Sequence, residues 1–214
     1  MTKEKRSYDE GCIAAHALDL IGDRWALLIV RELMLGPRRF NALREGLRGI
    51  SANVLTVRLG ELEAAGVVLR EEMPSPAAIT VYALTASGQA LWPVIRALCK
   101  WGAEKEGHDP NLFISPAALM LSMRAMCARD RAKDHVVNVF AAGEPFSIRT
   151  SANHYVLRRG LDLTARLTFE GGTNALASAI YGPLPLAQTA QGLIRFEGDV
   201  GEGQAFVNLF SLRG

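Results

Sequence analysis

The stretch GPRRFNALREGLRGISANVLTVRLGELEAAG, residues 36–66, decides the fold of the first half of the chain. Its first part places apolar side chains at Phe40, Leu43 and Leu47, the i, i+3 and i+7 spacing of a helix with one buried face. A short break at Gly46–Gly49 follows. A second amphipathic segment comes directly after it, so the stretch predicts two short helices joined by a tight turn.

The second helix has clear start and stop signals. Ser51 stands at the position of an N-cap, where its hydroxyl can accept a hydrogen bond from the first turn, and Gly66 ends the helix. Leucines at i, i+4 and i+7 mark the buried face: Leu55, Leu59 and Leu62. The outward side carries amide, hydroxyl, methyl and guanidinium groups, which suit base edges and phosphates in a DNA groove. The residues expected to enter the major groove are Ser51, Asn53, Thr56, Val57 and Arg58, and Arg38 and Arg39 are expected to contact phosphates.

Helices and a hairpin flank this pair. Apolar periodicity predicts helices over Ile13–Ile21 and Trp25–Leu35, the second capped by the carboxylate of Asp23. Two β-type runs, Val67–Glu71 and Ile79–Leu84, are separated by a proline-stiffened tip at Met73–Pro76, which predicts a wing.

Several motifs along residues 12–85 resemble one known family. They are GDRW at Gly22–Trp25, GPRRF at Gly36–Phe40, LTVRL at Leu55–Leu59 and YALT at Tyr82–Thr85. Over roughly its first half the chain resembles the HxlR-type winged-helix transcriptional regulators, relatives of the MarR-like group. The resemblance implies a dimeric, DNA-binding repressor or activator of bacterial type.

A further helix is expected over Ala86–Trp101, with Pro93 kinking it or marking an early turn. Its apolar stripe, which carries few charges, is formed by Leu91, Ile95, Leu98 and Trp101. Periodicity alone gives equal weight to a dimer interface and to packing against the helix's own domain. The family resemblance favours the dimer interface.

The sequence turns polar after this helix, which predicts a linker at residues 103–115 between domains at 1–102 and 116–214. The second domain starts with a helix at Pro116–Ala128. Strands are expected at Val136–Ala141, Phe146–Thr150, Tyr155–Arg158, Leu161–Phe169 and Leu193–Glu197, with helices at Asn174–Ile180, Leu186–Gln191 and Gly203–Leu212. The fold class is therefore α+β: an N-terminal winged helix-turn-helix domain followed by a smaller α+β domain with an antiparallel sheet.

The second domain resembles the sterol-carrier-type domains, less closely than the first half resembles its family. The resemblance lies in Asp162–Gly171, in the helix through Leu176 and Ile180, and in the stretch Gly192–Asp199. It implies an apolar pocket for a small hydrophobic effector. The candidate lining residues are Leu176, Ile180, Leu184, Leu193, Phe206 and Phe210, although apolar residues at these positions suit a structural core equally well.

Charge is concentrated locally. The formal net charge is only +2, but residues 24–58 contain seven arginines against two glutamates. Such a patch is sufficient to attract phosphates. No lysine or arginine occurs between Arg70 and Arg96, so we expect the wing to contribute shape more than charge.

The remaining motifs argue against catalysis. No nucleophile elbow, phosphate loop or zinc-protease motif is present, and the four histidines are scattered. We expect no enzyme activity, no cofactor and no metal site. The three cysteines are widely spaced, which predicts a reducing, cytoplasmic compartment, and no apolar run has the length of a membrane span. Cys12 precedes the first helix and is a possible redox sensor, as in some members of the family, but a small buried structural residue is the favoured interpretation.

Two functions from different classes therefore remain. The first is a DNA-binding, homodimeric transcriptional regulator that responds to a ligand through its second domain. The alternative is a carrier of lipids or other small apolar ligands in which the winged helix serves as a dimer and interaction module. Specific, strongly salt-dependent binding to double-stranded DNA distinguishes the first from the second.

Overall fold

The computed structural model describes residues 7–73 and 79–212. The chain divides into two compact units, residues 1–95 and 96–214, and the division falls inside helix α6. The limits that the sequence predicts, 1–102, 103–115 and 116–214, remain a prediction. The tip of the expected wing, from Pro74 onward, lies outside the described residues.

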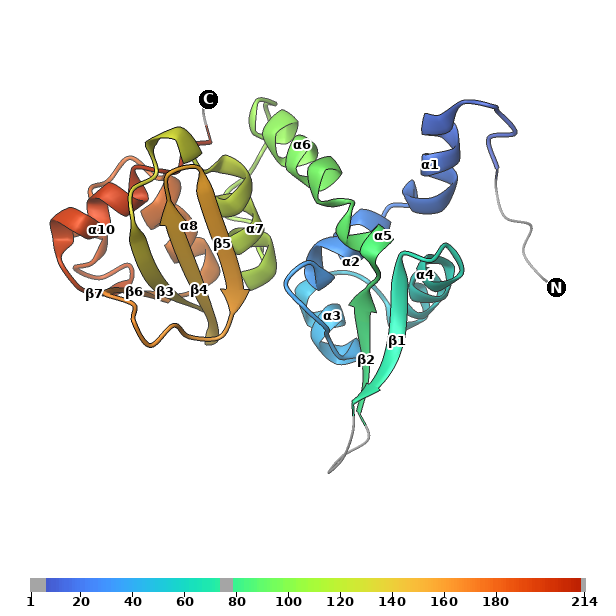
Figure 1. The fold of residues 1–214 in the computed structure, drawn as a ribbon, viewed down its shortest axis with the longest axis horizontal. Helices are drawn as coiled ribbons and strands as arrows, with labels where there is room; N and C mark the ends of the chain where they lie inside the picture. Colours follow the sequence, from blue (N-terminus) through green and yellow to red (C-terminus); the bar gives the residue numbers. More distant parts are fainter. Residues whose placement is uncertain (1–6, 74–78, 213–214) are drawn as a thin grey trace. The chain divides into compact units, whose positions relative to one another are not determined.

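The first unit is a winged helix-turn-helix domain (Figure 1). Helices precede a two-stranded antiparallel sheet in which Val68 is opposite Leu84 and Met73 is opposite Ile79. The elements are α1 (Ile13–Ile21), α2 (Ala26–Leu33), α3 (Phe40–Gly46), α4 (Ala52–Ala64), β1 (Val68–Met73), β2 (Ile79–Leu84), α5 (Ala86–Gln89) and the start of α6 (Trp92–Ala103). The order is the one that the sequence predicts.

Helix α4 begins and ends where its sequence signals stand. The hydroxyl of Ser51 accepts a hydrogen bond from the backbone N–H of Val54 at 3.3 Å. Gly66 follows the helix with a φ of 67°, a left-handed conformation that glycine adopts without strain. Both signals are confirmed.

Two expectations about helix boundaries are wrong. Asp23 does not cap α2, whose N-cap is Trp25 and receives no side-chain hydrogen bond. The carboxylate of Asp23 instead forms an ion pair with Arg58. The single helix expected over Ala86–Trp101 is two helices, α5 and α6, and Pro93 is the second residue of α6, where a helix needs no N–H donor.

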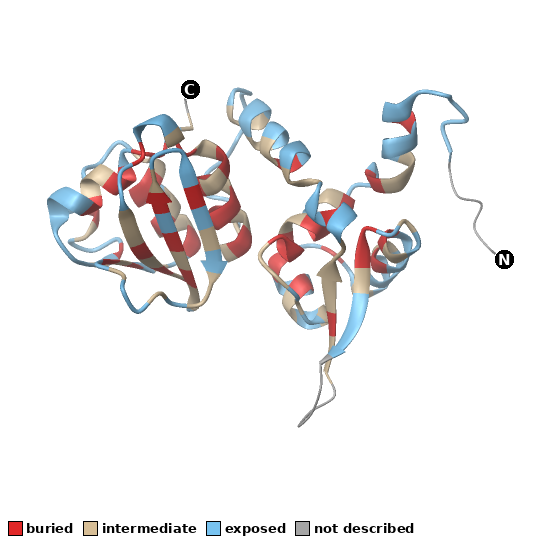
Figure 2. Ribbon diagram, in the orientation of Figure 1, coloured by how far each residue is buried: buried red, intermediate tan, exposed pale blue. Residues whose placement is uncertain are grey.

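The core of the first unit is formed by the apolar stripes of its helices. Ile29, Leu33, Leu43 and Leu55 are fully buried, and Leu59 is nearly so. Figure 2 shows this burial on the inward faces of α2, α3 and α4. Because α3 and α4 are fixed from inside, their outer faces remain available to a partner.

The second unit is a five-stranded sheet with helices on one face (Figure 1). The strands lie in the order β5-β4-β3-β6-β7, and three of the four neighbouring pairs are antiparallel. The pair β3–β6 is parallel, and the α+β class with antiparallel strands in the second domain is confirmed. The elements are α7 (Pro116–Met126), a short 3₁₀ turn (Arg129–Arg131), β3 (His135–Ala141), β4 (Glu144–Ser151), β5 (His154–Arg159), β6 (Leu167–Gly171), α8 (Thr173–Tyr181), α9 (Leu186–Thr189), β7 (Arg195–Glu197) and α10 (Val200–Val207).

Asp162 explains why the strand expected over Leu161–Phe169 begins only at Leu167. Its carboxylate accepts hydrogen bonds from Arg149 and Thr164, and its backbone exchanges two hydrogen bonds with the amide of Asn138. Residues 160–166 are therefore held as a loop. A second correction concerns α10, which begins at Val200 instead of Gly203 because Asp199 accepts a hydrogen bond from the N–H of Glu202 at 2.8 Å.

Aromatic rings fill the space between the sheet and its helices. The rings of Phe169 and Phe206 lie 5.8 Å apart, and Phe206 is 5.1 Å from Phe210. Asn174 on α8 donates hydrogen bonds to the carbonyl oxygens of Pro110 and Leu112. Part of the expected linker is therefore bound to the second unit.

Candidate nucleic-acid interface

The outer face of α4 carries the polar residues that the sequence assigns to the major groove. Asn53, Thr56 and Val57 are exposed, and 55% of the surface of Val57 is accessible. The hydroxyl of Thr56 donates a hydrogen bond to the carbonyl oxygen of Ala52 at 3.0 Å. Because Thr56 is exposed, its methyl group suits contact with a thymine methyl group, and its oxygen can still accept a hydrogen bond from a base amino group.

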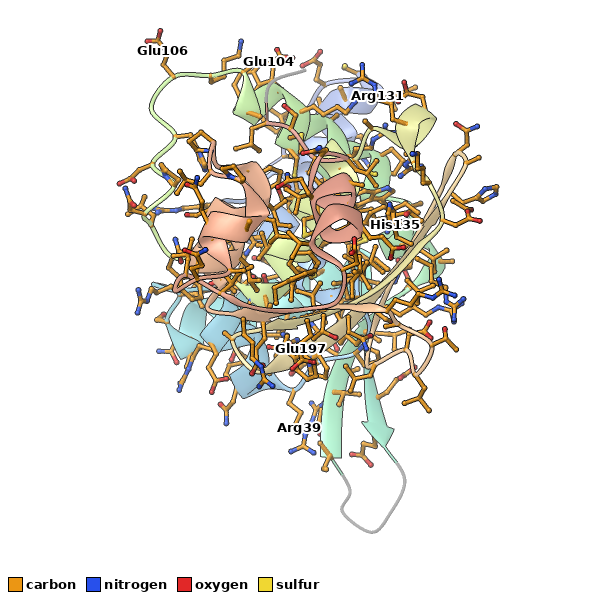
Figure 3. All side chains as sticks on the ribbon, turned by 90° about the vertical axis from the view of Figure 1, so that its left-hand side faces the viewer. Arg39, Glu104, Glu106, Arg131, His135 and Glu197 are labelled. Atoms are coloured by element: carbon orange, nitrogen blue, oxygen red, sulfur yellow. The ribbon has the colours of Figure 1, made fainter. Side chains whose placement is uncertain are left out.

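Arg38 and Arg39 stand at the start of α3, beside the wing. The backbone of Arg38 forms a β-bridge with Tyr82 of β2. Arg39 is the N-cap of α3 and is exposed. Figure 3 shows its side chain extending from the same end of this unit as the strands of the wing. The two arginines that are predicted to contact phosphates therefore lie next to β2, a strand of the wing.

Arg58 occupies a different environment from the other predicted contacts. Its guanidinium forms ion pairs with Asp23, which precedes α2, and with Glu61, one turn further along α4. Its side chain is only 24% exposed. The hydroxyl of Ser51 is likewise engaged, in the cap of α4. Of the five predicted major-groove residues, Asn53, Thr56 and Val57 are therefore exposed without an ion pair or a capping bond, and the Thr56 hydroxyl bonds only to its own helix.

Several exposed arginines of this unit, among them Arg44 and Arg24, are not among the predicted DNA contacts. Arg44 lies in the last turn of α3, and Arg24 has its guanidinium 5.4 Å from the centre of the Trp25 ring. Both belong to the basic stretch that the charge count identified. Their exposure on elements beside α4 could not be read from helical periodicity alone.

The predicted dimer stripe on α6 is only partly exposed. Leu98 and Trp101 are 48% and 62% exposed, whereas Ile95 is 5% exposed and Leu91 is half-buried. A side chain buried within its own chain contributes little surface to a partner, so Ile95 serves the core. Val94 was not among the predicted interface residues, but it is 41% exposed and continues the stripe through Leu98 to Trp101 at i, i+4 and i+7.

Helix α1 presents a second unpartnered apolar surface. Ile13 is 86% exposed and Leu18 is 50% exposed, although the helix is strongly apolar. The apolar spacing of this helix was visible in the sequence. Which of its apolar residues face solvent became clear only in the structure.

The three cysteines lie in three different environments. Cys12 is exposed at the N-cap of α1, where the backbone N–H groups of Ala15 and Ala14 hold the pKa of the thiol below its ordinary value. Cys127 is buried, and burial raises the pKa of its thiol. Cys99 is half-buried. The thiol of Cys12 is therefore favoured as a thiolate over that of Cys127, and its exposure is contrary to the buried structural role that the sequence favoured.

The residues predicted to line an apolar pocket separate into three places. Leu176 and Phe206 are core side chains, 1% and 0% exposed. Ile180, Leu184 and Phe210 border one hollow of about 440 Å³ between the α8–α9 loop and α10. Leu193 lies at another hollow, beside Gly171 and Ile194.

The described residues contain neither a metal-binding cluster nor a membrane-spanning helix. Within residues 7–73 and 79–212, no group of three or more His, Cys, Asp or Glu side chains is arranged to hold a metal ion. Over the same ranges, no helix has the length and apolar character needed to cross a membrane.

Comparisons with known proteins concern the first half of the chain. Residues 20–109 match the model of the family described as HxlR-like helix-turn-helix. The HTH-type transcriptional regulator YvaP of Bacillus subtilis is 40% identical over 88 residues, which cover 41% of this chain and 82% of YvaP. The HTH-type transcriptional regulator sll1512 of Synechocystis is 38% identical over 93 residues, 44% of this chain and 69% of the relative.

Among solved structures, the reduced form of the transcriptional regulator YodB from B. subtilis is 35% identical, with a TM-score of 0.42. That match covers 47% of this chain and 100% of YodB. The motifs, the winged helix-turn-helix fold and the relatives agree: this chain belongs to the HxlR-like helix-turn-helix family of transcriptional regulators.

Proposed function

We propose that the protein binds double-stranded DNA as a homodimer, with the outer face of α4 in the major groove and Arg38 and Arg39 on the phosphate backbone. The observation that carries this proposal is the exposure of Asn53, Thr56 and Val57 on a helix whose opposite face is fully buried. A rigid helix that presents short polar and methyl groups has the chemistry of direct base readout.

Dimerisation supports this function because a symmetric operator needs two recognition helices about 34 Å apart. The exposed apolar stripe of Val94, Leu98 and Trp101 on α6 is the surface that we assign to the partner copy. The exposed residues of α1, Ile13 and Leu18, are a second apolar surface of suitable chemistry. Burial of both surfaces in a dimer would remove large apolar side chains from water, which favours association.

The proposed function is tested by selection from a random duplex pool. The full-length protein is incubated with duplexes that contain a randomised 30-bp segment, and the bound duplexes are sequenced. We expect an enriched motif with two related half-sites about 10 bp apart, or at multiples of this spacing. Recovery of duplexes without any enriched sequence contradicts the proposal and favours the carrier function.

For the second unit we propose the binding of a small apolar effector at the hollow bordered by Ile180, Leu184 and Phe210. Its volume of about 440 Å³ is within the range of small-molecule sites. Leu184 is 52% exposed, so this apolar side chain meets solvent when the hollow is empty. A ligand that binds the two states of the dimer with different affinity changes operator affinity by roughly 5- to 150-fold.

The neutral fluorescent probe N-phenyl-1-naphthylamine tests this second proposal. We expect saturable binding to the full-length protein that is weakened by Leu184→Gln. Leu193→Gln is the matched control, because Leu193 is 44% exposed but borders a different hollow. Equal effects of both substitutions, or no saturable binding, contradict an effector site at Leu184.

The possible redox response rests on Cys12. Its exposure and its lowered pKa make it the candidate sensor thiol of the chain. A Cys12→Ser variant that retains operator binding but no longer loses it on treatment with diamide supports this role. Equal sensitivity of the two proteins to diamide contradicts it.

A further inference from the structure

Arg58 connects the recognition helix to the start of α2. Its guanidinium pairs with Asp23, 35 residues earlier in the chain, and with Glu61 on its own helix. The carboxylates are 57% and 49% exposed, whereas the arginine is 24% exposed. The arginine therefore lies inward of the two acidic groups.

The helical geometry of α4 agrees with this placement. Successive residues of an α-helix are rotated by about 100°, so Arg58 lies on the flank beside the buried stripe of Leu55, Leu59 and Leu62. The outward direction is occupied by Asn53, Val57 and Gly60, at i, i+4 and i+7. From this flank, the side chain of Arg58 reaches Asp23 at the start of α2 more easily than the base pairs of a DNA groove that faces the outer side of α4.

The local charge balance points the same way. Two carboxylates surround one guanidinium, so the cluster carries a formal net charge of −1. A phosphate or a guanine that approached Arg58 would have to displace carboxylates already bound to it. The planar guanidinium, with five donors, is the side chain best suited to hold two carboxylates at once.

We propose that Arg58 is a positioning residue: through Asp23 it fixes the angle of α4 on α2, while Asn53, Thr56 and Val57 set the base preference. This inference rests on the proposed function, because it concerns which side chains of α4 read DNA. An exposed ion pair contributes little to stability by itself. Its effect on binding is larger because a rotation of α4 displaces every base contact together.

The test uses full-length variants and the motif that the wild-type protein selects from the random duplex pool. Asp23→Asn, Arg58→Gln and the double variant are compared on a 40-bp duplex that carries this motif. We expect each single variant to bind roughly 5- to 30-fold more weakly than the wild type, and the double variant to bind no more weakly than either single variant. If Arg58 contacted DNA directly, Arg58→Gln would weaken binding to the duplex, but Asp23→Asn would not weaken it to the same extent.

Two further readouts separate positioning from direct contact. Selection is repeated with each variant, and the salt dependence of binding is measured. We expect Arg58→Gln to keep the wild-type motif and salt slope, whereas Thr56→Val loses the preference at one base pair. Arg58→Lys, which keeps the charge without the planar fork, should restore only part of the affinity. A purely structural defect would lower the melting temperature, so circular dichroism melts accompany each measurement.

Several outcomes overturn the inference. One is an Arg58→Gln variant that loses the preference at a single base pair, or whose salt slope falls by about one. Another is an Asp23→Asn variant that binds as the wild type does or more tightly, because that result makes Asp23 a competitor of DNA for Arg58. If the wild-type protein selects no motif, the proposed function fails and the positioning role fails with it. If the motif is selected but Asp23→Asn has no effect, only the positioning role fails.

Discussion

The backbones of Arg38 and Tyr82 exchange two hydrogen bonds, of 2.9 Å from the N–H of Arg38 and 2.8 Å from the N–H of Tyr82. This bridge attaches Arg38, which precedes the N-cap of α3, to β2. The start of α3 is therefore bonded to a strand of the wing. Because both bonds involve only the backbone, a substitution that removes the charge of Arg38 leaves the bridge in place.

Arg38→Gln and Arg39→Gln should weaken binding to all duplexes alike. Each removes a proposed phosphate contact, which carries no sequence information, and should reduce the slope of log affinity against log salt by about one. Fluorescence anisotropy with the selected duplex and a scrambled duplex measures both effects. Weakening confined to the selected duplex would place these arginines on base edges.

Asn53→Ala and Thr56→Val should act on specific binding. Each removes hydrogen-bonding groups from the exposed face of α4, and we expect a loss of about 1–3 kcal/mol with reduced preference at one base pair. Affinity for the scrambled duplex should not change. Selection with each variant identifies the affected base pair, and an unchanged motif with both variants contradicts the placement of α4 in the groove.

Leu98→Asp should dissociate the dimer. A carboxylate placed in an apolar interface without a partner costs several kcal/mol. Sedimentation velocity at micromolar concentration should show a monomer that no longer binds the selected duplex. Leu163→Asp is the control, since Leu163 is 98% exposed in the second unit and should leave the dimer intact. A Leu98→Asp protein that still sediments as a dimer places the interface elsewhere.

Gly46→Ala should destabilise the first unit. A Cβ atom at Gly46 would lie 2.5 Å from Oε2 of Glu32, a side chain with no exposed surface. We expect a cost of about 1–3 kcal/mol, measured by urea unfolding. Gly60→Ala is the matched control: nothing lies within 4 Å of its added Cβ, and alanine in a helix is favoured by about 0.5–1 kcal/mol. Equal stability of the two variants contradicts the close contact at Glu32.

The thiols should differ in their reaction with iodoacetamide as the pH rises. Because the pKa of Cys12 is lowered, its thiolate forms at lower pH than that of an ordinary cysteine, and the exposed sulfur is accessible. Burial raises the pKa of Cys127 and shields it. Peptide mass spectrometry at pH 6–9 should therefore show Cys12 alkylated first and with the lower apparent midpoint. Alkylation of Cys127 before Cys12 contradicts this order.

Local signals predicted most of the winged helix. The Ser51 cap, the leucine stripe of α4 and Gly66 act between residues close in sequence, so periodicity and capping chemistry are sufficient to place this helix. The same reasoning failed at Asp23, which stands where a cap is expected but pairs with Arg58, 35 residues away. The charge count over residues 24–58 began one residue after Asp23 and ended three residues before Glu61. It therefore omitted both carboxylates that pair with Arg58.

In the second unit, long-range contacts decided what the sequence missed. The alternation over Leu161–Phe169 predicted one strand, but Asp162 bonds to Arg149 and Asn138 on neighbouring strands and holds the first part as a loop. Apolar residues that the sequence assigned to the same pocket also differ in how far they are buried. Phe206 is fully buried against other rings, whereas Leu184 is exposed, and apolar character alone cannot distinguish a core from a pocket.

The salt dependence of binding to two duplexes shows whether the protein reads DNA sequence. The affinity of the full-length protein is measured between 50 and 200 mM salt for the selected duplex and for a scrambled duplex of equal length. We expect the selected duplex to be bound roughly 10³-fold or more tightly than the scrambled one at physiological salt, and both affinities to fall steeply as salt increases. Equal affinities for the two duplexes at every salt concentration would contradict sequence-specific DNA binding by this protein.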